Sequence, residues 1–326
     1  MKVLFATYPM AFHTPGGGEI QLLAYRKYLP AHGVEVTLFD QWNPRFLEHD
    51  IVHFFSCVGG SVHFCNFIKQ LGIPLVVSSS LWITEETKHL YPVGEIKHQF
   101  ALADRVVANS DTECEALAQV FELPREKFAT VYNGVEHTFY EPVAPELFRD
   151  QFAIRGPFVL NVGNIEPRKN QLTLVRALKA TPEVKLVLIG HQRDPDYARA
   201  CFEEGGNQVM YLGHLPHDSV LLRSAYAAAD VFCLPSTLET PGLAALEAHA
   251  AGCPAAVTEV GSTQEYFGDS VSYLHPTDVE SVLSAIQSAL ATRGCSRRSN
   301  SLSIENRRLD WQSALAALHT IYRSLV

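Results

Sequence analysis

Short apolar runs rich in Val, Leu, Ile and Phe alternate with helical patterns along the chain, and this alternation restricts the fold more than any other feature. It is typical of a parallel sheet with both faces covered by helices. In the first half the strand-like runs cover residues 3–8, 34–39, 51–55, 75–79, 105–109 and 128–132. The pattern begins again with residues 158–162, 184–189, 209–212, 231–234, 255–258 and 271–274. The sequence therefore predicts an α/β protein with two doubly wound parallel-sheet domains.

Local signals mark where several helices begin and end. Gly33 follows the first helical pattern and stands where a C-cap belongs. Ser110 and Glu113 have the spacing of a capping box, and so have Thr277 and Glu280. We expect helices to begin at both boxes.

The length also favours two domains, because 326 residues are about twice a typical domain of roughly 150. Residues 141–145, Glu-Pro-Val-Ala-Pro, are expected to form a linker between the halves. The Arg- and Ser-rich residues 294–303 are typical of an exposed loop, and a last helix is expected over about residues 306–325.

The charge distribution argues against several partners. The formal net charge is −9, and residues 1–150 hold 11 Lys and Arg against 18 Asp and Glu. A nucleic-acid binder needs a basic stripe that neutralises phosphates, and electrostatic docking on anionic lipid needs a similar surface. We therefore expect no nucleic-acid partner.

Compartment signals are few. No apolar run approaches the roughly 20 residues that span a bilayer, and the first residues lack the apolar core of a signal peptide. The seven cysteines are scattered and form no CxxC pair. We expect neither a disulfide framework nor a zinc site, and a location in the reducing cytoplasm.

The first strand leads into a glycine-rich loop at residues 16–19, Gly-Gly-Gly-Glu, followed by a helix. Glycines let the backbone approach a ligand closely, and the unpaired N–H groups of a helix start favour an anion. Asp40, at the end of the second strand, would suit a ribose in a dinucleotide site, but Gln21 stands where the third glycine of that motif belongs. The alternatives here are an anion-binding loop, a dinucleotide site and an ordinary tight turn.

The same order of strand, turn and helix returns at residues 163–170, Gly-Asn-Ile-Glu-Pro-Arg-Lys-Asn. Arg168 and Lys169 stand just before the helix, close to the partial positive charge of its first turn. Arginine offers a fork of donors and lysine a compact point charge, which together suit a diphosphate. The alternative is a pair of solvated loop cations, but the flanking strand and helix favour the anion site.

Residues 235–248 carry two glutamates, Glu239 and Glu247. Thr240 has the residue type of an N-cap and Pro241 suits the first helical position, so we expect a helix to begin here. The rise of a helix then places the two carboxylates roughly 10 Å apart, which suits two ends of one ligand with sugar or ribose hydroxyls. A pair of glutamates on a helix is also typical of a solvated face, and the flanking residues favour the site.

These residues resemble the signature of the GT-B glycosyltransferases of glycosyltransferase family 4, which is E-x7-E in a segment ending EA-x-A-x-G-x-P. Here the signature runs from Glu239 to Glu247 and continues through residues 248–254, Ala-His-Ala-Ala-Gly-Cys-Pro. The resemblance covers nearly the full length and is most specific in the second half. It implies an acceptor-binding Rossmann-like domain over residues 1–148, joined by a C-terminal helix over 308–326. It also implies a donor-binding Rossmann-like domain over 149–307, with a cleft between the two domains.

The resemblance further implies a retaining transfer of a sugar from a UDP- or GDP-sugar to a glycan, lipid-linked or small-molecule acceptor, in polysaccharide or glycoconjugate synthesis. No metal ion or other cofactor is expected. Arg168 and Lys169 would neutralise the donor diphosphate, Glu239 would contact the transferred sugar and Glu247 would bind the ribose. The other donor-binding residues implied are Gly17, Gly18, Gly163, Thr240, Pro241, Gly242 and Leu243.

On the acceptor side the chain departs from the family, which commonly has a His after the strand at residues 75–79. Here Ser79 and Ser80 stand, and we expect them on the acceptor side together with His13, a candidate general base. No side chain is an obvious covalent nucleophile, and the resemblance implies front-face attack as the mechanism. The alternatives are a non-catalytic GT-B subunit that stabilises an active glycosyltransferase or presents its acceptor, and a nucleotide-sugar epimerase on the same fold.

Overall fold

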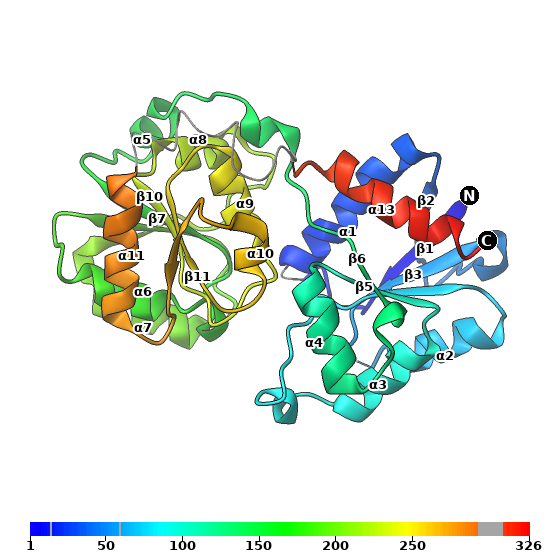
Figure 1. Cartoon of the computed structure of the whole chain (residues 1–326). Helices are drawn as coiled ribbons and strands as arrows, with labels where there is room; N and C mark the ends of the chain where they lie inside the picture. The colour runs from blue at the N-terminus through cyan, green and yellow to red at the C-terminus, as the bar shows by residue number, and fades with distance from the viewer. Residues whose placement is uncertain (14, 59, 293–308) are drawn as a thin grey trace. The chain divides into compact units, whose positions relative to one another are not determined.

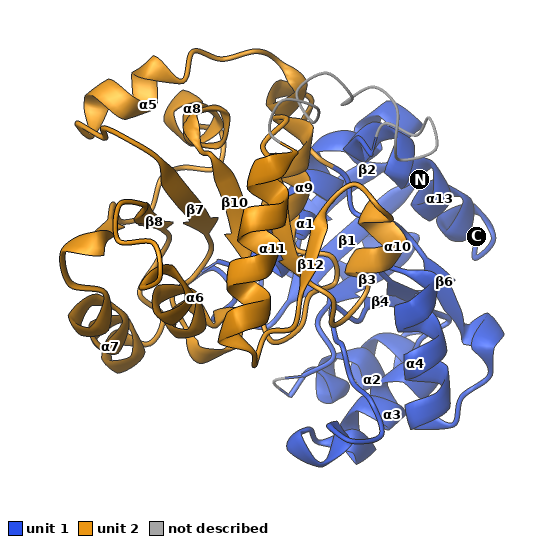
Figure 2. Ribbon diagram, turned by 60° about the vertical axis from the view of Figure 1, so that its left-hand side comes forward, with its two compact units in different colours: residues 1–134, 309–326 blue, residues 135–308 orange. Residues whose placement is uncertain are grey.

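The computed structural model describes residues 1–13, 15–58, 60–292 and 309–326. The chain forms two compact units, unit 1 with residues 1–134 and 309–326, and unit 2 with residues 135–308 (Figure 2). Both ends of the chain belong to unit 1 (Figure 1). The loop expected at residues 294–303 lies outside the described residues.

Unit 1 is built on a six-stranded sheet of order β2-β1-β3-β4-β5-β6, in which every neighbouring pair is parallel. Its strands are β1 (Lys2–Thr7), β2 (Glu35–Leu38), β3 (Ile51–Phe55), β4 (Leu75–Ser78), β5 (Arg105–Ala108) and β6 (Phe128–Thr130). Its helices are α1 (Gly17–Tyr28), α2 (Val62–Gln70), α3 (Val93–Leu102), α4 (Asp111–Phe121) and α13 (Trp311–Arg323).

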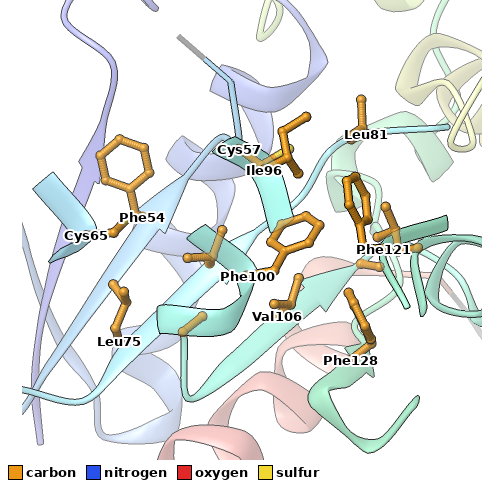
Figure 3. Close-up of a cluster of buried hydrophobic side chains, with 14 of the residues drawn as sticks. Phe54, Cys57, Cys65, Leu75, Leu81, Ile96, Phe100, Val106, Phe121 and Phe128 are labelled. Carbon is orange, nitrogen blue, oxygen red and sulfur yellow. The ribbon is translucent and has the colours of Figure 1, made fainter. Parts of the chain in front are cut away.

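Successive side chains of a strand point to opposite faces of the sheet, and helices cover both of these faces. On one face, strand residues such as Phe54 and Val106 pack with Phe100 of α3 and Phe121 of α4 (Figure 3). On the other face, Phe55 of β3 packs against Tyr25 of α1, and His53 of β3 packs against Tyr322 of α13. There the ring of Tyr25 lies 5.9 Å from that of Trp311.

Unit 2 has a second six-stranded parallel sheet, of order β12-β11-β10-β7-β8-β9. Its strands are β7 (Phe158–Val162), β8 (Lys185–Ile189), β9 (Val209–Tyr211), β10 (Val231–Leu234), β11 (Ala255–Thr258) and β12 (Ser272–Leu274). Its helices are α5 (Glu146–Gln151), α6 (Gln171–Leu178), α7 (Pro195–Gly205), α8 (Val220–Ala228), α9 (Leu243–Ala250), α10 (Thr263–Phe267) and α11 (Val279–Ala291). One core forms where α6, α7 and α11 pack on the sheet.

Residues 135–148, which precede the domain boundary expected from the sequence, belong to unit 2. The buried hydroxyl of Ser224 on α8 fixes this segment, since it donates to the Ala144 carbonyl (2.7 Å) and accepts from the Phe148 amide (3.0 Å). The chain is therefore tied to unit 2 before α5 begins.

The two doubly wound sheets confirm the predicted fold class, and each predicted strand is present with its ends shifted by no more than two residues. The C-cap at Gly33 is confirmed by its left-handed conformation. Ser110 is confirmed as the N-cap of α4, because its hydroxyl accepts from the Glu113 amide, but the Glu113 carboxylate accepts from the Asn109 amide and does not complete a capping box. The box at Thr277 is wrong by one residue. Asp278 caps α11 instead, because its carboxylate accepts from the Glu280 amide.

Two further observations bear on the compartment. The six cysteines in the described part of the chain are buried free thiols, and the reducing compartment stays a prediction. Within the same residues, no helix combines the length and the apolar character that crossing a membrane requires.

Candidate functional site

The candidate residues of unit 2 gather where the strand order of its sheet reverses, between β7 and β10. Loops that leave the carboxyl ends of two such strands diverge to opposite sides, which opens the ligand crevice typical of doubly wound sheets. Gly163 follows β7 directly, and Pro235 follows β10. The sheet itself thus brings residues 163–170 and 235–242 to one place.

Polar contacts hold these loops together. The side-chain amide of Asn170 donates to the carbonyls of Pro235 (2.9 Å) and Pro276 (2.7 Å). The Thr237 amide donates to the Arg168 carbonyl at 2.9 Å. The loops after β7, β10 and β12 are therefore fixed to one another.

The centre of the site is a buried ion pair between Lys169 and Glu239. Lys169 Nζ lies 2.5 Å from Glu239 Oε1, and Arg168 Nη1 lies 3.8 Å from the same oxygen. The Glu239 side chain is 6% exposed, whereas Arg168 is 45% exposed and also contacts Glu166. Burial alone would raise the pKa of Glu239, but the charges of Lys169 and Arg168 outweigh it and hold the pKa below its usual value.

The backbone places the Glu239 carboxylate close to the start of α9. The Glu239 amide donates to the Val260 carbonyl, and the Ser262 amide donates to the Glu239 carbonyl. A Cβ at Gly242 would lie 3.1 Å from Glu239 Oε2 and 2.7 Å from a methyl of Leu234, so only glycine leaves room for the carboxylate.

The helix start expected at Thr240 and Pro241 is wrong by two residues. Gly242 has φ of +87°, outside the helical region, and α9 begins at Leu243 with Gly242 as its N-cap. Thr240 and Pro241 therefore lie in the loop that links Glu239 to the helix.

Glu247 lies in the second turn of α9, and both oxygens of its carboxylate have hydrogen-bond partners. His217 Nε2 lies 2.7 Å from Oε1, and the Tyr226 hydroxyl donates to Oε2 at 2.8 Å. Glu247 is 5% exposed. Sequence reasoning missed His217 and Tyr226, since neither has a regular spacing from Glu247.

In unit 1, the structure treats the three acceptor-side candidates differently. Ser79 is buried and donates to Glu113 Oε1 at 2.6 Å, so its proton is committed to a carboxylate. Ser80 is exposed at φ +43°, with its hydroxyl 3.3 Å from Gln21 Oε1. His13 is exposed in the loop after β1.

The glycine loop of unit 1 starts a helix. Gly17 and Gly18 open α1, and the Gly16 amide donates to Glu19 Oε2 at 2.7 Å. Gln21, one turn further, donates to the side-chain carbonyls of Asn109 and Asn133, at 2.7 Å each. The sequence showed only that Gln21 interrupts a dinucleotide-binding motif. In the structure Gln21 is buried and forms hydrogen bonds with two asparagines.

No metal site is apparent in the part of the chain that the structure describes, because no three His, Cys, Asp or Glu residues there are grouped to hold an ion. In unit 2 the cations that could face a diphosphate are Arg168 and Lys169, and Glu239 and Glu247 could accept hydroxyl groups.

Two doubly wound parallel sheets, with a Lys–Glu pair at the strand reversal of the second, define the GT-B class of proteins. The model of the glycosyl transferases group 1 matches residues 146–307, and that of glycosyltransferase family 4 matches residues 41–139. The chain belongs to this family of glycosyltransferases.

Curated relatives and solved structures resemble the chain as follows. An uncharacterized glycosyltransferase of Methanocaldococcus jannaschii is 28% identical over 206 residues, which cover 58% of this chain and 52% of that protein. The D-inositol 3-phosphate glycosyltransferase of Xylanimonas cellulosilytica is 28% identical over 248 residues, 71% of this chain and 59% of that protein. The chain thus spans little more than half the length of these relatives. The crystal structure of Anabaena HepE in complex with UDP-glucose superposes with a TM-score of 0.80 at 20% identity, covering 99% of this chain and 100% of that one.

Proposed function

We propose that the protein is a retaining glycosyltransferase that moves a sugar from a nucleoside diphosphate sugar to an acceptor. The donor binds in unit 2 and the acceptor in unit 1. The observation that carries this proposal is the pairing of Lys169 and Arg168 with the buried Glu239 at the strand reversal of unit 2. Cations beside a carboxylate suit a ligand with a diphosphate at one end and hydroxyl groups at the other.

Stabilising the leaving diphosphate is the main catalytic contribution in this proposal. As the bond to the sugar breaks, negative charge grows on the diphosphate and positive charge on the sugar ring. The negative charge on the diphosphate is stabilised by Lys169, Arg168 and the amide groups at the start of α9. These groups take the role that a metal ion has in metal-dependent transferases. Donors fixed before the reaction need no reorganisation during it, and the loop contacts of Asn170 and Thr237 provide that fixation.

The two glutamates contact different parts of the donor. Glu239 lies beside the cations and contacts the transferred sugar, while Glu247 accepts from the ribose hydroxyls. In this proposal no side chain acts as a covalent nucleophile. The acceptor attacks the sugar on the same face from which the diphosphate leaves. The donor class is supported by Anabaena HepE, whose structure holds UDP-glucose.

A panel of UDP- and GDP-sugars tests the proposal without knowledge of the acceptor. A ligand at a hundred times its Kd stabilises a folded protein by about 2.7 kcal/mol. We expect one or more nucleotide sugars to raise the melting temperature by several degrees, and the matching free sugars to leave it unchanged. A full panel without a shift at millimolar concentration would contradict the proposal.

A further inference from the structure

Two side chains outside the family signature, Tyr226 and His217, form hydrogen bonds with the carboxylate of Glu247. Tyr226 comes from α8 and His217 from the loop between β9 and α8, and each contacts a different oxygen of Glu247, at 2.8 and 2.7 Å. An ionised carboxylate has about four acceptor positions, two on each oxygen. One position on each oxygen therefore stays open, which matches two neighbouring hydroxyl groups.

One aromatic ring, that of Phe139, packs against both donors. The ring of Phe139, in the short helix η5 (His137–Tyr140), lies 5.6 Å from the His217 ring and 5.8 Å from the Tyr226 ring. Phe139 is 2% exposed and Tyr226 is fully buried, whereas the His217 side chain is 30% exposed. His217 alone of the two donors is open to solvent.

The two donors differ in how they respond to pH. Burial, together with the charge of Glu247, raises the pKa of Tyr226 well above its usual value, so this hydroxyl always donates. Burial alone would lower the pKa of His217, but the hydrogen bond and charge of Glu247 outweigh it and raise the pKa above 6.5. Glu136, ahead of η5, and Asp218, beside His217, act in the same direction.

We propose that Tyr226 and His217 are positioning residues that orient Glu247 toward the ribose, and that the charge on His217 tunes the affinity for the nucleotide. This inference rests on the proposed function, because it takes Glu247 as the ribose contact. A charged imidazolium holds the carboxylate in a charge-assisted hydrogen bond and adds positive charge beside an anionic ligand. Nucleotide affinity is therefore highest when His217 is protonated. By linkage, the nucleotide in turn favours protonation of His217.

Calorimetric titration of the full chain with UDP and with GDP, at pH 6, 7 and 8, tests this. His217→Gln keeps an N–H donor but removes the titration. Tyr226→Phe removes only the hydroxyl, and His137→Gln replaces an exposed histidine of the same unit as a control. The nucleotide phosphate itself titrates near pH 6, so the ratio of the wild-type affinity to that of the variant is the quantity to follow.

We expect His217→Gln to bind about five- to tenfold more weakly than the wild type at pH 6, with the ratio falling as the pH rises. Wild type should also take up more protons on binding than this variant, measured in two buffers of different ionisation enthalpy. Tyr226→Phe should bind about tenfold more weakly at every pH and keep the wild-type pH dependence. His137→Gln should match the wild type.

Equal affinity, equal pH dependence and equal proton uptake in wild type and His217→Gln would overturn the inference while the proposed function stands. A loss of affinity that is the same at all three pH values would also overturn it, because it would make His217 a merely structural partner. A wild type that binds neither nucleotide would instead refute the proposed function, and the inference with it.

Discussion

Lys169 and Glu239 are the residues on which the proposed chemistry most depends, because each balances the other's charge in a buried place. Lys169 Nζ is 2.5 Å from the carboxylate and 15% exposed, whereas Arg168 is three times as exposed and shares its charge with Glu166. Lys169 is the more buried point charge, and Arg168 is the more exposed cation beside it.

The substitution Lys169→Ala should weaken binding of UDP or GDP by about 10- to 150-fold. This range corresponds to the roughly 1.5–3 kcal/mol of a charge-assisted contact. Calorimetric titration measures it. The matched control is Lys179→Ala, an exposed lysine of unit 2 that pairs with Glu204 and should leave the affinity unchanged. Unaltered binding by Lys169→Ala would remove Lys169 from the diphosphate site.

Glu239→Gln should lower turnover far more than nucleotide affinity. The amide keeps the shape of the carboxylate but loses the charge that interacts best with the positive sugar ring of the transition state. We expect kcat to fall at least tenfold, or about 1.4 kcal/mol, and the Kd of the free nucleoside diphosphate to change less than about threefold. Steady-state kinetics with the donor found in the panel, beside titration of the nucleotide, measure both.

Glu183→Gln, at an exposed position of unit 2, is the control for that substitution. Parallel losses in affinity and turnover would make Glu239 a simple binding residue. Wild-type kinetics in Glu239→Gln would show that the carboxylate has no part in the reaction.

At this scale the sequence predicted the signature residues but not their partners. The spacing of Glu239 and Glu247, and the cations after β7, could be seen directly. His217 and Tyr226 could not, because their contacts with Glu247 join segments far apart in the sequence. The commitment of Ser79 to the buried Glu113 was hidden for the same reason.

At the scale of elements, the helix starts show where local rules fail. Ser110 caps α4 as predicted, because its hydroxyl accepts from the Glu113 amide, a contact within the first turn that needs no other segment. Thr240 and Pro241 have equally good residue types for the start of α9. The helix begins later there because Gly242 must pass over the Glu239 carboxylate, a requirement of tertiary packing.

The helix α13 is joined to the sheet of unit 1 by a series of buried hydrogen bonds. The Tyr322 hydroxyl lies 2.6 Å from His53 Nδ1, and His53 Nε2 lies 2.8 Å from the Ser78 hydroxyl. Gly134 lets the chain approach closely, because a Cβ there would overlap the backbone nitrogen of Trp311. Burial lowers the pKa of His53 to about 3, so the histidine is neutral in the folded protein.

Unit 1 should therefore lose stability as the pH falls from about 6.5 towards 3. In this window the unfolded chain protonates His53 and the folded chain does not, which favours unfolding by up to about 1.4 kcal/mol per pH unit. The tryptophans at positions 42, 82 and 311 all belong to unit 1, so denaturant unfolding followed by tryptophan fluorescence reports this unit.

His53→Gln should flatten this dependence, and His89→Gln, at an exposed position of unit 1, should not. If the wild type and His53→Gln lost stability in parallel between pH 6.5 and 4, the histidine would not be neutral in the folded state.

For the whole molecule, the repeated alternation of strands and helices was enough to predict two doubly wound sheets. Apolar runs of four to six residues determine where buried strands lie, because both faces of each sheet are covered. The order of the strands could not be predicted in this way, since it depends on contacts between distant segments. That order matters most for function, because the reversal between β7 and β10 brings Lys169 to Glu239.

The most direct test of the central claim is release of nucleoside diphosphate by the purified protein from the nucleotide sugar that stabilises it best. Water serves as a slow acceptor, so the measurement separates an enzyme from a non-catalytic partner subunit of the same fold. The account predicts a slow release that saturates with donor concentration and falls at least tenfold in Lys169→Ala. A nucleotide sugar that binds tightly, yet is not cleaved with water or with any of a range of glycan acceptors, would contradict it.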